Sequence, residues 1–358
     1  MDHPITFPLQ FAHGSSTGAS QSPQVSVIIC TRNRADSLRV TLQALAAADR
    51  RGIRVEVVVV DNAGNDSARQ VVESFASQFS VRYLYQPVTG IFGKSHALNC
   101  ALDAGGLGAL IVILDDDISV DPDWFLQLAA ISARWPQMDI FTGTTYVVWP
   151  AGPVPAWASP PRIQTLILSA ACFGPTDTEL QGGQWCVGGH FWFRSRVLQH
   201  RPRFPDCWAT EPVFQLDLAE LGFRSVACPQ ARAGHRVQHA LLDRRAALER
   251  ARKTGRDVAW VRLQPFRTRV KQARMLRDHP WFGRLFCLVN YLRWRASSLL
   301  SIFYPSGSAR FERRLLAAER MTMYLELYRA ASTLPEYSLR ARRPTAHPRG
   351  SSPASSKA

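Results

Sequence analysis

Short apolar runs alternate with amphipathic segments through the first third of the chain. Four of these runs are rich in β-branched residues and end in polar ones, as strands of a buried parallel sheet do: VSVIIC (25–30), VEVVVV (55–60), VRYLYQ (81–86) and ALIVIL (109–114). The intervening segments, residues 36–48, 67–79 and 95–104, carry apolar residues at helical spacing, and Asp36 is predicted to cap the first of them. This alternation predicts an α/β fold with an open, mostly parallel sheet flanked by helices.

Polar residues follow each predicted strand. They are Thr31, Arg32 and Asn33 after the first strand, Asp61 and Asn62 after the second, and Asp115, Asp116 and Asp117 after ALIVIL. In open α/β sheets ligands bind beyond the carboxyl ends of the strands. We therefore expect these side chains to meet at one edge of the sheet.

The rest of the chain divides by composition. Residues 146–161, rich in Pro, Gly and Trp, predict an irregular segment, and WCVGGHFWFR (185–194) predicts a strand that begins at a glycine hinge. From residue 241 the chain becomes Arg-rich with helical spacing. We divide it into a flexible leader (1–24), an α/β domain (25–240), a basic helical extension (241–335) and a disordered basic tail (336–358).

Composition narrows the class of protein. The 358 residues are 46% hydrophobic and 20% charged, which is the range of a globular protein. The seven cysteines form no C-x-x-C pair, so we expect reduced thiols rather than a metal site or a disulfide framework. The N-terminus resembles no signal peptide, and no run of ~18 apolar residues predicts a spanning helix. We expect a cytoplasmic protein.

The positive charge lies in the C-terminal third. The net charge is −4 over residues 1–150, +2 over 151–240 and +17 over 241–358. Such asymmetry predicts contact with an anionic surface, either membrane headgroups or nucleic acid. Residues 285–304 mix leucines with Arg293 and Arg295, which favours a helix lying in a membrane interface. No nucleic-acid-reading motif is present, so we expect peripheral membrane attachment on the cytoplasmic face and no specific nucleic-acid partner.

Three adjacent carboxylates need a positive partner, because their mutual repulsion is otherwise a cost. Asp115 and Asp117 flank one residue at a strand end, so together they can present oxygen ligands to Mg²⁺ or Mn²⁺ that also binds a nucleotide diphosphate. The alternative for such a triplet on its own is a solvated turn that caps the next helix.

Several segments resemble, in order and spacing, those of family 2 glycosyltransferases with the GT-A fold. They are VSVIICTRNR (25–34), VVVVDNAGND (57–66), GIFGKSHALNCAL (90–102), ILDDDISVDPDW (113–124), VGGHFWFRSRVL (187–198) and ATEPVFQLDLAELGFRSVACPQARAGH (209–235). The resemblance extends to about residue 240, so residues 25–240 are expected to form a GT-A catalytic domain with a mixed, mostly parallel sheet. It implies a metal-dependent, inverting glycosyltransferase that moves a sugar from a nucleotide-sugar, with a UDP-sugar expected, to a hydroxyl of a glycan or lipid-linked acceptor in surface polysaccharide or glycolipid assembly.

The resemblance also implies roles for single residues. Asp61 would hydrogen-bond the nucleoside, with Thr31, Arg32 and Asp116 beside it. Asp115 and Asp117 would hold Mg²⁺ or Mn²⁺, and His235 would reach the cation or a phosphate; a structural histidine is the alternative. Lys94 would contact a phosphate, with a solvated lysine as the alternative.

The resemblance places the catalytic base at Glu211, eleven residues before Gly222. The family usually has Glu-Asp where this chain has Thr210 and Glu211, so Asp217 is kept as a second candidate. A glutamate that only faces the helix dipole is the structural alternative. The tryptophans fit either a sugar-stacking wall or the core: Trp149, Trp157, Trp185, Trp192 and Trp208.

Two other functions remain open at the level of sequence. An inactive GT-A-like module could tether the basic region to anionic lipid or nucleic acid. A nucleotidyltransferase also pairs an α/β sheet with a metal held by aspartates, but it usually carries a Gly-rich basic loop after the first strand, and CTRNRADS is not such a loop.

Overall fold

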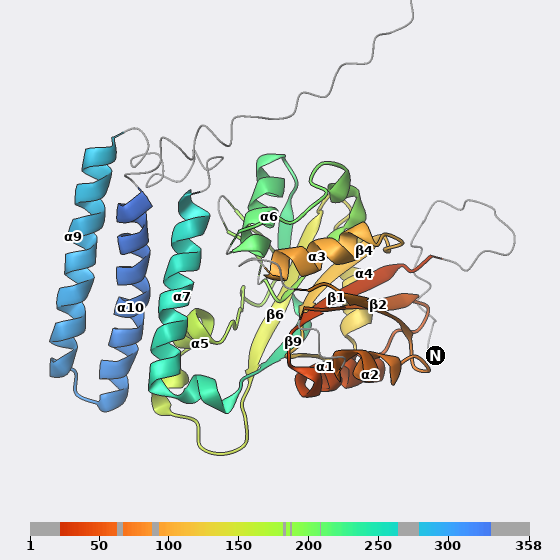
Figure 1. Cartoon of the computed structure of the whole chain (residues 1–358), viewed down its shortest axis with the longest axis horizontal. Helices are drawn as coiled ribbons and strands as arrows, with labels where there is room; N and C mark the ends of the chain where they lie inside the picture. Colours follow the sequence, from red (N-terminus) through yellow and green to blue (C-terminus); the bar gives the residue numbers. More distant parts are fainter. Residues whose placement is uncertain are drawn as a thin grey trace, which may run out of the picture.

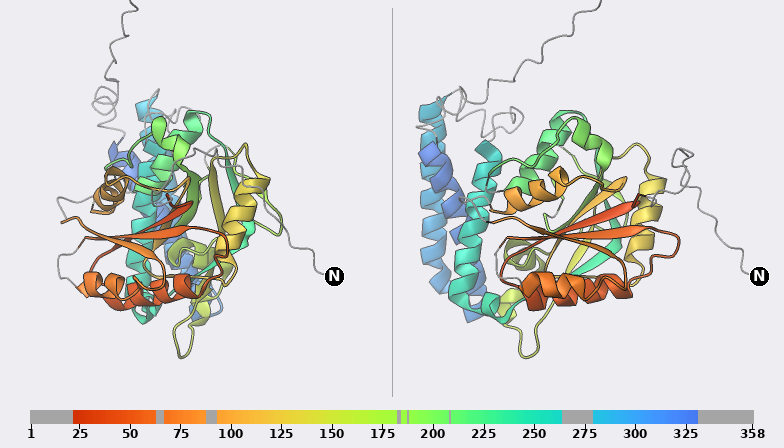
Figure 2. Two further views of the ribbon diagram at one scale, coloured as in Figure 1. Left: turned by 90° about the vertical axis from the view of Figure 1, so that its right-hand side faces the viewer. Right: turned by 45° about the vertical axis from the view of Figure 1, so that its right-hand side comes forward.

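The computed structural model of the chain describes residues 22–62, 67–87, 93–181, 184–186, 188–207, 209–263 and 279–330. The predicted tail (336–358) and residues 1–21 of the predicted leader lie outside these ranges. In the described part, a mixed sheet is covered by helices on both faces, and three long helices stand beside it (Figures 1 and 2).

The sheet has nine strands in the order β3-β2-β1-β4-β8-β6-β9-β5, and β7 pairs with β9 off this path. Their bounds are β1 Val25–Thr31, β2 Val55–Asp61, β3 Ser80–Tyr85, β4 Leu110–Asp115, β5 Ile118–Val120, β6 Ile140–Val148, β7 Thr178–Glu179, β8 His190–Arg194 and β9 Ser225–Arg236. Strands β3, β2, β1 and β4 are parallel, β8 runs antiparallel to both β4 and β6, and β6 and β9 are parallel. The predicted open, mixed sheet of GT-A type is confirmed.

Alternate side chains of β1 enter two different cores. Val25, Val27 and Ile29 pack on one face with helices α1, α2 and α4, whereas Ile28 packs on the other face with α3 and α6. The period of two in a strand requires this division. The bounds of the covering helices are α1 Ala35–Ala47, α2 Ser67–Glu73, α3 Gly93–Asp103, α4 Trp124–Arg134, α5 Pro161–Ile167 and α6 Thr210–Glu220.

Two local predictions need correction. Asp36 does not cap α1: the N-cap position is Arg34, without a capping side-chain hydrogen bond, and Asp36 lies in the first helical turn. The segment from residue 146 is not irregular throughout, because β6 continues to Val148 before the loop begins. Short 3₁₀ segments follow at Ala156–Ala158, Ser195–Gln199, His239–Leu242 and Leu300–Phe303.

The predicted C-terminal helices are present as α7 (Arg244–Leu263), α9 (Pro280–Leu299) and α10 (Gly307–Ala330). They stand side by side with α10 between the other two, so that α9 is outermost (Figure 1). Helix α7 packs on the α/β part at two places, through Ala247 and Ala251 beside α5 and through Val261 beside α6. Among the residues described, none of the helices combines the length and the apolar character that crossing a bilayer requires. The domain boundary at 240/241 stays a prediction.

Candidate active site

The register of the parallel strands brings the expected polar residues to one edge of the sheet. Thr31 at the end of β1 is in register with Asp61 at the end of β2, and Cys30 is in register with Asp115 at the end of β4. Asp61 is fully buried and accepts a hydrogen bond from the Tyr83 hydroxyl at 2.9 Å. The carboxyl ends of these strands therefore gather Thr31, Asp61 and Asp115 within one row.

The middle aspartate, Asp116, is buried and bound within the protein. Its Oδ2 accepts a hydrogen bond from Thr31 Oγ1 at 2.7 Å, and its Oδ1 lies 2.7 Å from a terminal nitrogen of Arg34. The Ser37 and Thr41 hydroxyls both donate to its backbone carbonyl at 2.8 Å. Burial raises the pKa of Asp116 to about 6, although Arg34 and Thr31 act in the opposite direction. Asp116 thus ties β4 to β1 and α1, and its predicted contact with the nucleotide stays a prediction.

The third aspartate, Asp117, lies between two cationic groups. Its Oδ2 is 2.6 Å from Arg34 and 3.4 Å from His235 Nε2, while its buried Oδ1 has no hydrogen-bond partner among the described residues. Burial alone would raise the pKa of Asp117, but the hydrogen bonds from His235 and Arg34 hold it well below the usual range. Conversely, burial lowers the pKa of His235, but Asp117 outweighs burial and raises it.

Arg34 is a site residue that the sequence reasoning missed. Of the two arginines in CTRNR, Arg32 was predicted to line the nucleotide pocket, yet its side chain is exposed. Arg34 instead pairs with both Asp116 and Asp117. Charge balance alone could have pointed to it, because three adjacent carboxylates need a cation nearby.

Lys94 joins the sheet edge to helix α6. From the first turn of α3 its Nζ reaches Asp115 Oδ1 at 2.7 Å and Glu211 Oε1 at 2.5 Å. Burial by itself would lower the pKa of Lys94, but the two carboxylates raise it well above the ordinary value. A Cβ at Gly188 would lie 3.1 Å from Glu211 Oε1, and one at Gly189 would lie 2.2 Å from Asp115 Oδ2. The glycine pair before β8 therefore leaves space for both carboxylates.

The second candidate base, Asp217, lies elsewhere on α6. It forms an ion pair with Arg201 at 2.7 Å and does not line the cavity that holds Glu211. Glu211, which is 8% exposed, faces that cavity from the first turn of the helix. Geometry therefore favours Glu211 as the candidate base.

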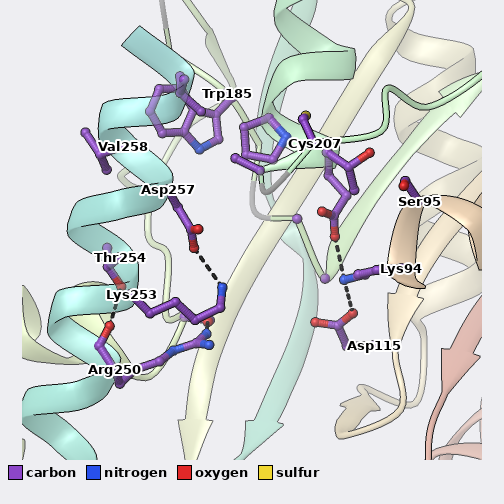
Figure 3. Close-up of a pocket in the computed structure, with 18 of the residues that line it drawn as sticks. Lys94, Ser95, Asp115, Trp185, Cys207, Arg250, Lys253, Thr254, Asp257 and Val258 are labelled. Carbon is purple, nitrogen blue, oxygen red and sulfur yellow. Dashed lines mark hydrogen bonds and ion pairs between the residues drawn. The ribbon is translucent and has the colours of Figure 1, made fainter. Parts of the chain in front are cut away.

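A cavity of about 520 Å³ separates this edge of the sheet from helix α7. One wall carries Lys94, Asp115, Glu211 and His235, and the other carries six residues of α7: Arg250, Lys253, Thr254, Asp257, Val258 and Val261. Figure 3 shows Arg250, Lys253 and Asp257 across the cavity from Lys94 and Asp115. The composition of α7 predicts a separate basic extension, so this wall is not predicted from the sequence.

The tryptophans divide between the core and the cavity. Trp157 and Trp192 are buried in the core. Trp185 lines the cavity (Figure 3), and Trp149 packs at the margin of the apolar cluster around Trp157. Trp208 lies outside the described residues. Trp185 is therefore the tryptophan placed to contact a sugar among those that the structure describes.

Part of the candidate metal site fits a hard cation. The unpartnered, buried Oδ1 of Asp117 is a suitable oxygen ligand. His235 Nδ1 donates to the Leu168 carbonyl at 2.7 Å, which leaves Nε2 as the ligating nitrogen of the neutral ring. The described residues contain no group of three or more His, Cys, Asp or Glu side chains that could hold a metal ion. A site of one or two carboxylates completed by substrate phosphates is the arrangement that Mg²⁺ usually takes.

The sequence of this chain is similar to those of known glycosyltransferases and of a polysaccharide biosynthesis protein. The model of the family described as Glycosyl transferase family 2 matches residues 26–200. Succinoglycan biosynthesis protein ExoM of Rhizobium meliloti (strain 1021) is 27% identical over 227 residues, which is 54% of this chain and 68% of the relative. Validoxylamine A glucosyltransferase of Streptomyces hygroscopicus subsp. jinggangensis (strain 5008) is 30% identical over 139 residues, which is 38% of this chain and only 32% of that relative.

A solved structure shares the fold. The mannosyltransferase PcManGT from Pyrobaculum calidifontis, in complex with GDP-Man and Mn²⁺, aligns over 90% of this chain and 89% of its own with a TM-score of 0.52 and 19% sequence identity. The matched residues 26–200 include Asp61, Lys94 and the three aspartates, but end before Glu211 and His235.

Proposed function

Because residues 26–200 belong to glycosyl transferase family 2, we propose that this glycosyltransferase moves a sugar from a nucleotide-sugar to an acceptor hydroxyl in the cavity between the sheet edge and α7. The bridge from Asp115 through Lys94 to Glu211 is the observation that carries the proposal. The bridge connects Asp115, at the end of the cavity where we propose that the diphosphate binds, with Glu211, a carboxylate suited to be a base.

Glu211 is the proposed general base. It takes the proton from the acceptor hydroxyl as the hydroxyl oxygen bonds to the anomeric carbon. The bond from that carbon to the phosphate oxygen breaks, and its electron pair leaves with the nucleotide diphosphate. Attack from the side opposite the leaving group inverts the anomeric centre. Lys94 contacts Glu211 Oε1 and thereby fixes the position of this carboxylate beside Asp115.

We propose Asp117 and His235 as ligands of a divalent cation, Mn²⁺ or Mg²⁺, with Asp115 nearby at the same wall. Such a cation would neutralise the charge that develops on the departing diphosphate. Arg34 and Lys94 hold the aspartates in place before any ligand binds.

Donor and acceptor are proposed as classes. Asp61, buried at the end of β2, is proposed to accept a hydrogen bond from the nucleoside, and a UDP-sugar is the donor expected. A relative is named for succinoglycan biosynthesis, which supports assembly of a surface polysaccharide or glycolipid. Trp185 and the polar face of α7 would then hold the acceptor glycan or its lipid-linked form.

We also propose that the outer face of α9 binds an anionic membrane surface, on the cytoplasmic side where nucleotide-sugars are made. Trp281, Leu285, Leu292 and Phe303 are all more than two-fifths exposed in α9 and the 3₁₀ turn after it. Residues 280–304 carry three arginines and no acidic residue. An apolar face with only positive charge around it suits anionic headgroups, whereas two such faces would repel each other in a symmetric dimer.

A thermal-shift screen tests the proposed function. UDP-, GDP- and dTDP-sugars are added with and without Mn²⁺, and turnover of any donor that binds is then measured. One class of donor should raise the melting temperature in the presence of the cation, because a ligand that binds only the native state stabilises it. A protein that neither shifts nor turns over any donor would be the inactive lipid- or nucleic-acid-binding module instead.

The metal role has its own variant. Asp117→Asn keeps the shape of the side chain and should abolish the cation-dependent part of the shift. Asp123→Asn, at an exposed carboxylate before α4, is the matched control and should behave like the wild type. An unchanged cation-dependent shift in Asp117→Asn would remove Asp117 from the proposed metal site.

A further inference from the structure

Helix α7 lies beyond the residues that match the family, yet it forms one wall of the cavity. Its two cations at this wall differ in their partners. Lys253 pairs with Asp257 at 2.8 Å, and this pair is drawn in Figure 3. Arg250 pairs with no carboxylate among the described residues. One terminal nitrogen donates to Ser169 Oγ at 3.3 Å, and its buried Nε has no hydrogen-bond partner there.

An arginine on a cavity wall that has no carboxylate partner and a buried, unbonded Nε is costly unless a ligand completes its hydrogen bonds. A buried polar group that lacks a hydrogen bond costs about 1–3 kcal/mol in proteins, and more when it is charged. The planar guanidinium presents several N–H groups in a fork that matches two phosphate oxygens. The chemistry of Arg250 therefore points to a phosphate.

The contacts of Arg250 place it at the metal end of the cavity. It bonds Ser169, and the neighbouring Leu168 carbonyl accepts the hydrogen bond that orients His235. Ser169 has a φ of 53°, the left-handed region that side chains rarely adopt. Strain of this kind persists only where the surrounding structure fixes it, and it is concentrated at functional sites. Here the strained backbone directs the Leu168 carbonyl to His235 and the Ser169 hydroxyl to Arg250.

We propose that Arg250 binds the diphosphate of the nucleotide-sugar and stabilises the negative charge that the diphosphate gains when the bond to the sugar breaks. The inference rests on the proposed function and adds to it a residue outside the matched region. It also gives α7 a role in donor binding. Lys253, by contrast, is already paired with Asp257.

The test compares nucleoside and nucleoside diphosphate. On the full-length chain, UDP binding is measured by calorimetry with Mn²⁺, and uridine binding is measured by ligand-observed NMR. If the thermal-shift screen selects a GDP- or dTDP-sugar, GDP with guanosine or dTDP with thymidine replaces UDP with uridine. Arg250→Gln should weaken diphosphate binding roughly 10-fold to 100-fold, the range for a lost hydrogen bond to a charged group. It should leave nucleoside binding unchanged.

Arg252→Gln is the matched control, because Arg252 is exposed on the same helix and does not line the cavity. Circular dichroism confirms that each variant is folded. If the wild type binds no nucleoside diphosphate, the proposed function fails. If the wild type binds one and Arg250→Gln binds it equally well, or loses nucleoside affinity to the same extent, the role of Arg250 alone is overturned.

Discussion

Each carboxylate of the turn formed by Asp115, Asp116 and Asp117 is held by a cation of the same chain. Arg34 takes the second and third, and Lys94 takes the first together with Glu211. The pairs relieve the repulsion that three neighbouring charges would otherwise cause. Asp117 Oδ1 has no hydrogen-bond partner among the described residues. A ligand can therefore bind to this atom without first breaking the network of ion pairs.

Replacing Glu211 by glutamine should stop transfer without stopping donor binding. The amide has nearly the same shape but cannot accept the proton of the acceptor hydroxyl, and loss of a general base typically costs about 10²–10⁴-fold in rate. Transfer kinetics and the donor-induced thermal shift measure the two effects separately. Asp217→Asn, on the same helix but outside the cavity, is the control and should retain most of its activity. The reverse result, with Asp217 essential and Glu211 dispensable, would exchange their roles.

A buried histidine should make the protein sensitive to acid. His190 accepts a hydrogen bond from Trp124 Nε1 at 2.9 Å, and burial lowers its pKa to about 3. Between pH 6.5 and 3 the unfolded chain binds a proton at this residue that the folded chain does not. The free energy of unfolding therefore falls as the pH is lowered through this window, by up to about 1.4 kcal/mol per pH unit.

Denaturant titrations across this pH window measure the effect, with His190→Gln as the comparison. The variant should be less stable at pH 7 but should have a shallower decline towards acid. The carboxylates of the site are common to both proteins, so the difference between the slopes isolates His190. Equal slopes would show that His190 is protonated in the folded state.

The positions of candidate site residues could be predicted where a short motif carries them. Asp61, Lys94 and Asp115 lie in strand ends or a helix start, and the structure brings Lys94 and Asp115 into contact. Arg34 and Arg250 could not be found this way. Which of two arginines in a loop turns inward depends on its partner's position, and Arg250 reaches the cavity only because α7 packs back onto the sheet edge.

At the scale of elements, strand and helix periodicity predicted the parallel half of the sheet, because three of its four strands, β1, β2 and β4, are predominantly apolar runs. The packing of α7 was not predictable in the same way. Four of its five buried residues are small, Ala247, Ala251, Gly255 and Ala259, and carry little hydrophobic signal. Small residues bring backbones close, so a helix with a polar composition makes a tight contact.

Gly255 is the tightest point of that contact. A Cβ there would lie 2.3 Å from the carbonyl oxygen of Glu319 in α10. In an isolated helix, alanine is favoured over glycine by about 1 kcal/mol. Here the clash with backbone should win, because overpacking typically costs about 1–3 kcal/mol. We expect Gly255→Ala to lower the free energy of unfolding and, by shifting α7, to weaken donor binding.

Gly307→Ala supplies the comparison, since no heavy atom lies within 4 Å of a Cβ at that position. It should be neutral or slightly stabilising. Chemical denaturation gives the stabilities and the thermal shift gives donor binding. A Gly255→Ala protein as stable as the wild type would show that α7 and α10 can separate without cost.

At the scale of the whole molecule, the positive charge is concentrated in the C-terminal third of the sequence, and the exposed apolar residues of α9 belong to the same third. The N-terminal 150 residues carry a net charge of −4 and the last 118 carry +17. Helix α9 is the outermost of the three long helices (Figure 1), and its residues Trp281, Leu285, Leu288 and Leu292 are exposed. An amphipathic helix binds a membrane through both apolar burial and attraction to anionic lipid, and the two contributions respond differently to salt.

Vesicle co-sedimentation separates these contributions. The full-length protein should bind vesicles that contain phosphatidylglycerol, bind phosphatidylcholine vesicles much less, and be released in part by high salt. Leu285→Glu with Leu292→Glu adds two negative charges to the apolar face and should abolish binding. Leu221→Glu, at a leucine that is 56% exposed beside α6, changes charge away from this face and should bind as the wild type does. If the double variant binds as the wild type does, or if the wild type does not bind at all, the α9 face has no role at the membrane. If only the double variant loses vesicle binding, the cavity lies on a protein held at a lipid surface, from which a lipid-linked acceptor can be drawn.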